Sequence, residues 1–152
     1  MGWETYVSRT ISADAPTVWS VITDFSSYSE WNPTLVRATG AAEIGERLRF
    51  HLVLPGGVRV PFRARVSVVE EERELRWRGS IKGVITTEHA IQIEQLTADT
   101  EGERVRVVQR ERLDGALALP GMGVLGSTVR EGIEDMNAAL ANRVERLSET
   151  ED

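Results

Sequence analysis

The sequence contains no cysteine, which excludes disulfide bonds, thiolate metal ligands and a cysteine nucleophile. Histidine is nearly as scarce, because only His51 and His89 are present. A zinc site would therefore need carboxylates for most of its ligands, and no HExxH spacing exists. We expect neither a metal site nor a cofactor.

Long apolar runs are also missing. No stretch approaches the ~18 uninterrupted apolar residues of a membrane-spanning helix, so we expect no stable insertion into a membrane. The N-terminus has no basic region followed by an apolar run, and no secretory signal is evident. These absences predict a cytoplasmic protein.

Size and charge are those of an ordinary globular domain. The chain has 152 residues, of which 41% are hydrophobic and 28% charged. This predicts one domain over residues 1–152, with a core from about 3 to 147. The net charge of −6 favours solubility and gives no general attraction to nucleic acid, so we expect no nucleic-acid partner.

The N-terminal part predicts one strand and two short helices. Residues 3–11 alternate loosely and are rich in strand-forming residues. A helix is expected to follow, because Asp14 can cap its free amides and Pro16 is tolerated in a first turn. Residues 24–31 predict the second helix, which ends before Pro33 because the residue preceding proline avoids the helical region.

From about residue 34 to 114 the hydrophobic period is two, as in strands. Turn signals at 55–57, 82–83 and 100–103 separate the strands. Successive strands joined by short turns predict an antiparallel meander with one apolar face and one wet face.

The C-terminal part predicts one long amphipathic helix of roughly 20 residues. Its apolar positions are Val129, Ile133, Met136, Leu140, Val144 and Leu147. Residues 116–126 are expected to form an apolar, glycine-rich loop before it, and 148–152 a frayed tail. Only this helix can cover the apolar face of the sheet. The predicted class is therefore α+β: a seven-stranded curved antiparallel sheet wrapped around a long C-terminal helix, with two short helices between strands 1 and 2.

Two segments carry a family resemblance: residues 11–19 read ISADAPTVW, and residues 24–33 read DFSSYSEWNP. Together with the predicted order of strands and helices, these segments resemble the SRPBCC superfamily, and most of all its polyketide cyclase/dehydrase group. The resemblance implies the helix-grip fold of START lipid-transfer domains and birch pollen allergens, with an apolar cavity between sheet and long helix. Members range from lipid carriers to aromatase/cyclases, so the fold leaves function open. No residue set here matches a characterised catalytic motif of the family.

Strand parity places His89 and Glu111 on the apolar side of the sheet. In the fold that the chain resembles, their strands are neighbours. A buried carboxylate needs a partner or a proton, and a histidine is a suitable partner. Such a pair can hold a ligand hydroxyl or act as general acid and base, and Thr87 and Gln109 can add hydrogen bonds. It can also be a structural pair that only orients the core. We prefer ligand positioning, because no nucleophile or oxyanion site is evident.

Apolar pocket walls are expected around this pair. Trp77 faces inward, where it is either a flat surface for a ring-containing ligand or an ordinary core residue. Residues 119–126 either gate the pocket or allow close backbone packing at the helix entrance. Further wall candidates, each of which can instead be plain core, are Phe50, Phe62, Met122, Leu125, Val129 and Ile133.

Seven arginines occupy outward positions of the meander: Arg63, Arg65, Arg76, Arg78, Arg106, Arg110 and Arg112. A basic face can dock an acidic partner, an anionic lipid or RNA. However, Glu88 and Glu94 share this face and predict cross-strand ion pairs. No aromatic residues interleave with the arginines. We therefore interpret the face as a solvated one.

The leading hypothesis is a domain that binds or carries a hydrophobic, ring-containing small molecule, with His89 and Glu111 as the polar anchor. The first alternative is an enzyme of the polyketide cyclase/dehydrase type that uses the same two residues for proton transfer. The second is a protein-interaction module, for example a homodimer, that uses the basic face or a sheet edge.

Overall fold

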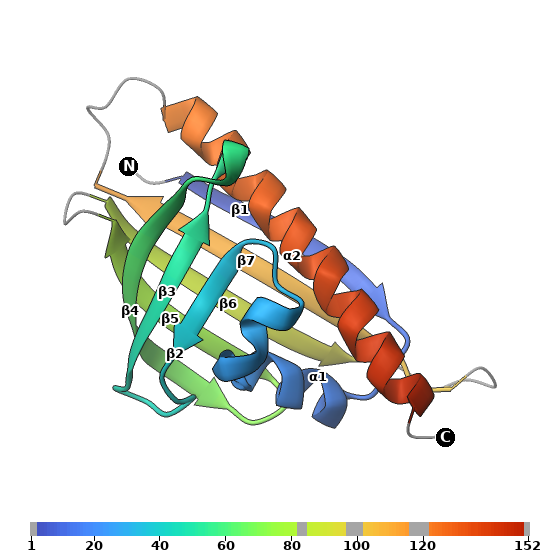
Figure 1. The fold of residues 1–152 in the computed structure, drawn as a ribbon. Coiled ribbons are helices and arrows are strands. Elements are labelled where there is room, and N and C mark those ends of the chain that lie inside the picture. Colours follow the sequence, from blue (N-terminus) through green and yellow to red (C-terminus); the bar gives the residue numbers. More distant parts are fainter. Residues whose placement is uncertain (1–2, 82–84, 97–101, 116–121, 151–152) are drawn as a thin grey trace.

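A computed structural model of the chain describes residues 3–81, 85–96, 102–115 and 122–150. Seven strands form one antiparallel sheet in the order β1-β7-β6-β5-β4-β3-β2. They are β1 (Trp3–Ile11), β2 (Leu35–Thr39), β3 (Arg47–Val53), β4 (Arg59–Glu70), β5 (Glu74–Ile81), β6 (Ile85–Gln95) and β7 (Val105–Asp114). The sheet curves around the long helix α2 (Met122–Thr150), which crosses its concave side (Figure 1). The helix-grip prediction is confirmed.

Two short helices connect β1 to β2, as predicted. Helix α1 (Ala15–Thr23) begins at the Asp14 cap, whose Oδ1 accepts a hydrogen bond from the Thr17 amide at 2.9 Å. The second is the 3-10 helix η1 (Phe25–Glu30). A third short turn, η2 (Pro55–Gly57), joins β3 to β4. Together, α1 and η1 close one end of the curved sheet (Figure 1).

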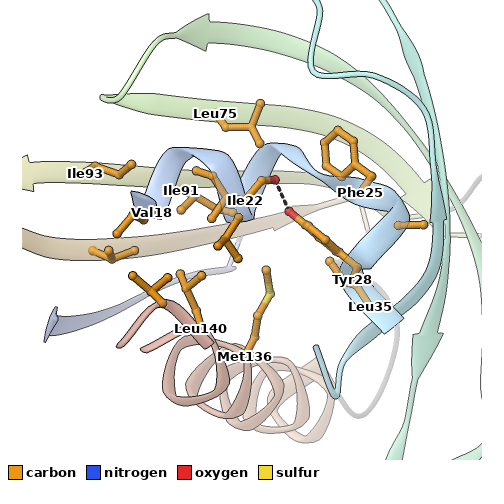
Figure 2. Packing of buried hydrophobic residues seen from close by; sticks show 14 of the residues in the cluster. Val18, Ile22, Phe25, Tyr28, Leu35, Leu75, Ile91, Ile93, Met136 and Leu140 are labelled. Atoms are coloured by element: carbon orange, nitrogen blue, oxygen red, sulfur yellow. Dashed lines mark hydrogen bonds between the residues drawn. The ribbon is translucent and has the colours of Figure 1, made fainter. Parts of the chain in front are cut away.

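The core lies where α1, the sheet and α2 meet (Figure 2). Aliphatic side chains from all three layers are almost completely excluded from solvent. Burial of each such side chain contributes about 1.5–3 kcal/mol, so this contact holds the helix against the sheet. The residues labelled there include Val18, Ile22, Leu75, Ile91, Ile93, Met136 and Leu140.

Tyr28 ties η1 to α1 inside this core. Its hydroxyl donates a hydrogen bond to the Ile22 carbonyl at 2.5 Å (Figure 2). Burial raises the pKa of the Tyr28 hydroxyl, so it remains a donor. Tyr28→Phe leaves the carbonyl without this partner and should lower the free energy of unfolding by about 1–3 kcal/mol in urea denaturation. Tyr6→Phe is the control, since Tyr6 is 51% exposed and the hydrogen bond that its hydroxyl accepts from Arg110 is exposed to solvent, so the change there should stay within about 0.5 kcal/mol. Equal effects of the two substitutions would contradict the role assigned to Tyr28.

Helix α2 is longer than predicted. It spans 29 residues and includes 122–126, which we expected to be loop, and 148–150, which we expected to be frayed. The reason lies partly in the contact at Gly126, where a Cβ atom would lie 2.6 Å from Trp3 Nε1. Close packing on β1 thus outweighs the helix penalty of glycine, about 1 kcal/mol. The remainder of the proposed gate, 119–121, lies outside the described residues.

Some expected turns also fall outside this description, namely 82–83 and the first half, 100–101, of the turn expected at 100–103. Within the described part of the chain, no helix is both long enough and apolar enough to cross a membrane.

Candidate functional site

A small cavity lies between the concave side of the sheet and α2. Its volume is about 80 Å³. An engineered cavity of about 150 Å³ in another protein holds benzene, so this one is too small for a ring in its present shape. Seven of the predicted pocket residues line it: Phe62, Trp77, Thr87, His89, Glu111, Val129 and Ile133.

His89 and Glu111 meet at one wall of this cavity. They are directly opposite each other in the antiparallel pairing of β6 with β7, so the strand register itself brings them together. The distance from His89 Nδ1 to Glu111 Oε2 is 2.5 Å. His89 is 5% exposed and Glu111 8%, which places the pair inside the protein.

A chain of amide groups fixes the protonation of the imidazole. It starts at the Val107 carbonyl, which can only accept and takes a hydrogen bond from Asn137 Nδ2 at 3.3 Å. Asn137 Oδ1 then accepts from Gln109 Nε2 at 3.1 Å. Gln109 Oε1 is thereby left to accept from His89 Nε2 at 2.9 Å. The network therefore assigns a proton to Nε2 of His89.

This assignment leaves one proton between His89 Nδ1 and Glu111 Oε2. Either the protonated carboxyl donates to a neutral imidazole, or an imidazolium donates to the carboxylate. Without that proton two acceptors would face each other at 2.5 Å. Burial raises the pKa of Glu111, although the hydrogen bond with His89 opposes the shift. The pair is thus a buried site that holds one exchangeable proton.

Thr87 brings an unsatisfied hydroxyl to the same cavity. It lies two residues before His89 on β6 and is 6% exposed. Its Oγ1 is buried and has no hydrogen-bond partner. A buried polar group without a partner costs about 1–3 kcal/mol, and a ligand or an ordered water molecule can supply the missing bond.

Trp77 forms the wall next to His89. The two rings stack with centroids 4.9 Å apart and planes at 14°. One face of the indole is therefore already covered, and the expected flat surface for a ligand ring is reduced. The indole also contacts Phe50 and Phe25, which connects the cavity wall to the aromatic core.

Phe50 and Gln109 do not line the cavity, in contrast to our expectation. Phe50 is 1% exposed and packs between Phe62 and Tyr28 in the core. Gln109 is fully buried behind His89, where its Oε1 accepts a hydrogen bond from Nε2 of the imidazole. Parity assigns both correctly to the inner face, but it cannot tell cavity wall from core. The side chains of Met122 and Leu125 lie outside the described residues.

Several lining residues were missed by the sequence analysis: Thr34, Leu35, Leu52, Val53, Leu54, Leu113, Thr128, Gly132 and Met136. Met136 had been placed on the inner face of the helix but not at the pocket. Asn137, which orients Gln109, was also missed. It lies four residues after Ile133 and three before Leu140, so its helical spacing could have identified it as a polar residue on the buried face.

Thr34 closes the cavity on the side of β2. Its hydroxyl donates to the carbonyl of Gly132 at 2.8 Å, which joins the start of β2 to α2. Among the described residues, no three His, Asp or Glu side chains come together as a metal-binding group.

Comparisons with solved structures support the fold. A START superfamily protein from Mycobacterium smegmatis is 21% identical, with 95% of this chain and 98% of that chain covered and a TM-score of 0.78. The Zhui aromatase/cyclase from Streptomyces sp. R1128 is 18% identical, with 96% and 95% covered and a TM-score of 0.76. Similarity at this level of identity concerns the fold alone.

Sequence comparison identifies the family. No curated protein matches the chain. A family model described as polyketide cyclase / dehydrase and lipid transport matches residues 2–145, which is nearly the whole chain and agrees with the resemblance of the N-terminal segments. The protein therefore belongs to the polyketide cyclase/dehydrase and lipid transport family.

Proposed function

We propose that the protein binds a small hydrophobic molecule that carries a hydroxyl or carbonyl group. The observation that supports this most strongly is a buried polar corner, formed by Thr87, His89 and Glu111, in a mostly apolar cavity. An unsatisfied hydroxyl only destabilises an apolar core, whereas in a binding site it can form a hydrogen bond with a ligand.

The polar corner selects the ligand group. The Thr87 hydroxyl can donate to a carbonyl oxygen or accept from a hydroxyl. Glu111 uses Oε2 for His89, which leaves the other carboxyl oxygen, Oε1, for a ligand. That oxygen is the second atom available to a ligand hydroxyl. A ligand without a polar group would leave the Thr87 hydroxyl unsatisfied.

Binding of a ring-containing molecule requires the cavity to widen. Its volume of about 80 Å³ is roughly half the volume of an engineered cavity that binds benzene. The Thr34–Gly132 hydrogen bond spans the side of the cavity where β2 approaches α2. Separation of α2 from β2 at this contact would enlarge the cavity without disturbing the core around α1.

The test compares 2-naphthol with naphthalene, which differ by one hydroxyl, using calorimetry on the wild type and two variants. Thr87→Val keeps the shape but removes the hydroxyl and should weaken 2-naphthol binding about tenfold, the value of one hydrogen bond. It should leave naphthalene binding unchanged. Thr86→Val is the matched control, since Thr86 is exposed on the outer face of the same strand.

Native mass spectrometry of protein purified from its own host extends this test to the natural ligand. A bound apolar compound with an oxygen function is expected. Absence of any binder in both experiments, or an equal loss of both naphthalene compounds in Thr87→Val, would contradict the proposal.

Acid–base catalysis in the same cavity is the second candidate, and the shared proton of His89 and Glu111 favours it. The two candidates differ in the fate of the compound. A carrier returns it with unchanged mass, whereas a dehydrase releases a product lighter by one water. Conversion that Glu111→Gln abolishes while binding persists would select the enzyme.

A further inference from the structure

The outer face of the sheet has two electrostatically different halves. On β5–β7 the arginines are paired with carboxylates, as the solvated-face interpretation requires. The pairs are Arg76 with Glu74 and Glu88, Arg78 with Glu88, Arg106 with Glu94, Arg110 with Glu4, and Arg112 with Asp114. The predicted cross-strand pairing with Glu88 and Glu94 is confirmed for Arg76, Arg78 and Arg106. Arg110 and Arg112 are paired as well, but with Glu4 and with Asp114 of the same strand, which we did not predict.

On β3 and β4 this pairing fails. Among the described residues, none of Arg47, Arg49, Arg63 and Arg65 forms an ion pair with a carboxylate. The strand register places Arg47 opposite Arg65, and Arg49 opposite Arg63. Like charges directly opposite each other destabilise a sheet, by a few tenths to about 1 kcal/mol per pair. These four arginines, the unpaired arginine cluster, therefore weaken the isolated fold.

A hollow on the outer face lies over this cluster. Its volume is about 730 Å³, and the four arginines line it together with Arg78 and Arg112. Glu88 and Asp114 also line it, but each is paired with one of the latter two arginines, so the excess positive charge comes from the four of β3 and β4. The exposed hydroxyls of Ser80 and Thr86 also line it, and Ser80 is opposite Arg63. The cavity with His89 lies on the other face of the sheet.

We propose that this hollow binds a ligand that carries clustered phosphate groups. Directly opposed side chains on neighbouring strands are about 5 Å apart at Cβ, so two guanidinium groups can reach one phosphate. A phosphate offers oxygens in several directions and can bridge both, whereas a carboxylate has two oxygens in one plane and suits one guanidinium. The bound charge would also remove the Arg49–Arg63 and Arg47–Arg65 repulsion. The chain as a whole has a net charge of −6, so this cluster is a local feature.

The test measures tripolyphosphate binding by calorimetry, with sodium chloride at matched ionic strength as the blank. Arg49→Gln/Arg63→Gln removes one opposed pair and should weaken binding at least tenfold. Arg106→Gln/Arg110→Gln is the matched control: it removes the same charge from paired arginines on the same face and should change binding less than threefold. Without ligand at low salt, the first variant should melt at the same or a higher temperature than wild type, because a repulsion is relieved.

Two further arms identify the source of the phosphate. Sedimentation with phosphatidylglycerol vesicles, and its inhibition by tripolyphosphate, would identify a lipid headgroup. Binding of tripolyphosphate without vesicle binding would identify a soluble phosphorylated ligand. Failure to bind either probe, equal losses in the two double variants, or binding of poly-glutamate alone would overturn the assignment.

Discussion

Trp77→Ala should lower the free energy of unfolding by about 3–5 kcal/mol in urea denaturation, because it removes the largest fully buried side chain. The indole packs on His89, Phe50 and Phe25, so its loss leaves a void that these rings cannot fill by small movements. Trp19→Ala is the control, since Trp19 is only partly buried and should be less costly.

The same substitution should also create a site for a flat apolar molecule. Trp77 forms part of the cavity wall, so the void merges with a space that already measures about 80 Å³. Indole added at millimolar concentration should raise the stability of Trp77→Ala but not of wild type, because a ligand that binds only the folded state stabilises it. A loss of stability below about 1 kcal/mol would show that Trp77 is not a core residue. A lack of rescue by indole would show that Trp77 is not part of the cavity wall.

His89→Ala should destabilise the protein by about 3–5 kcal/mol at pH 8, since it leaves the buried Glu111 carboxylate without its partner. Gln109 Oε1 also loses its donor. Chemical denaturation measures the effect. His51→Ala is the matched control, because the only other histidine of the chain lies on the outer face and should contribute less than about 0.5 kcal/mol.

The loss in His89→Ala should grow as the pH rises. Burial raises the pKa of Glu111, and the hydrogen bond with His89 is the main opposing influence, so the variant raises that pKa further. A group whose pKa is raised by folding stabilises the fold below its ordinary value, about 4.3, and loses this contribution as the pH rises through the folded value. The effect should therefore be smaller at pH 5 than at pH 8.

Glu111→Gln added to His89→Ala separates charge from packing. The amide does not titrate, so the double variant should lose the pH dependence and recover part of the stability at pH 8. If His89→Ala and the double variant show the same dependence on pH, Glu111 is not the titrating group.

The fold was largely predictable because the hydrophobic periodicity agrees with the positions of the turn and helix-cap residues along the chain. Alternation over β3–β7 assigns the inner face, and Asp14 with Pro16 marks the start of α1 as predicted. The start of α2 was not predictable, because glycine normally argues against a helix. Its reason, the contact between Gly126 and Trp3, joins residues far apart in the sequence.

The candidate site was predictable only in part. Parity identifies His89 and Glu111 as inward, and the antiparallel register then places them opposite each other. Their hydrogen-bond distance, the orientation of Gln109 through Asn137 and the cavity volume depend on side-chain packing to within about an ångström. No periodicity in the sequence carries that information. The four arginines of β3 and β4 show the same limit, because ion pairing depends on which carboxylates the register brings within reach.

The contact between Thr34 and Gly132 affects the size of the cavity but not the polar groups that recognise a ligand. A Cβ atom at position 132 would lie 3.3 Å from Thr34 Cγ2 and press against it. A residue with a side chain there acts as a spacer that sets how far α2 stands from the margin of the sheet. A substitution at position 132 would thus change the cavity volume while the polar groups of β6 and β7 stay unchanged. Variants of this protein can therefore differ in the size of the ligand that they bind and keep the same polar contacts to it.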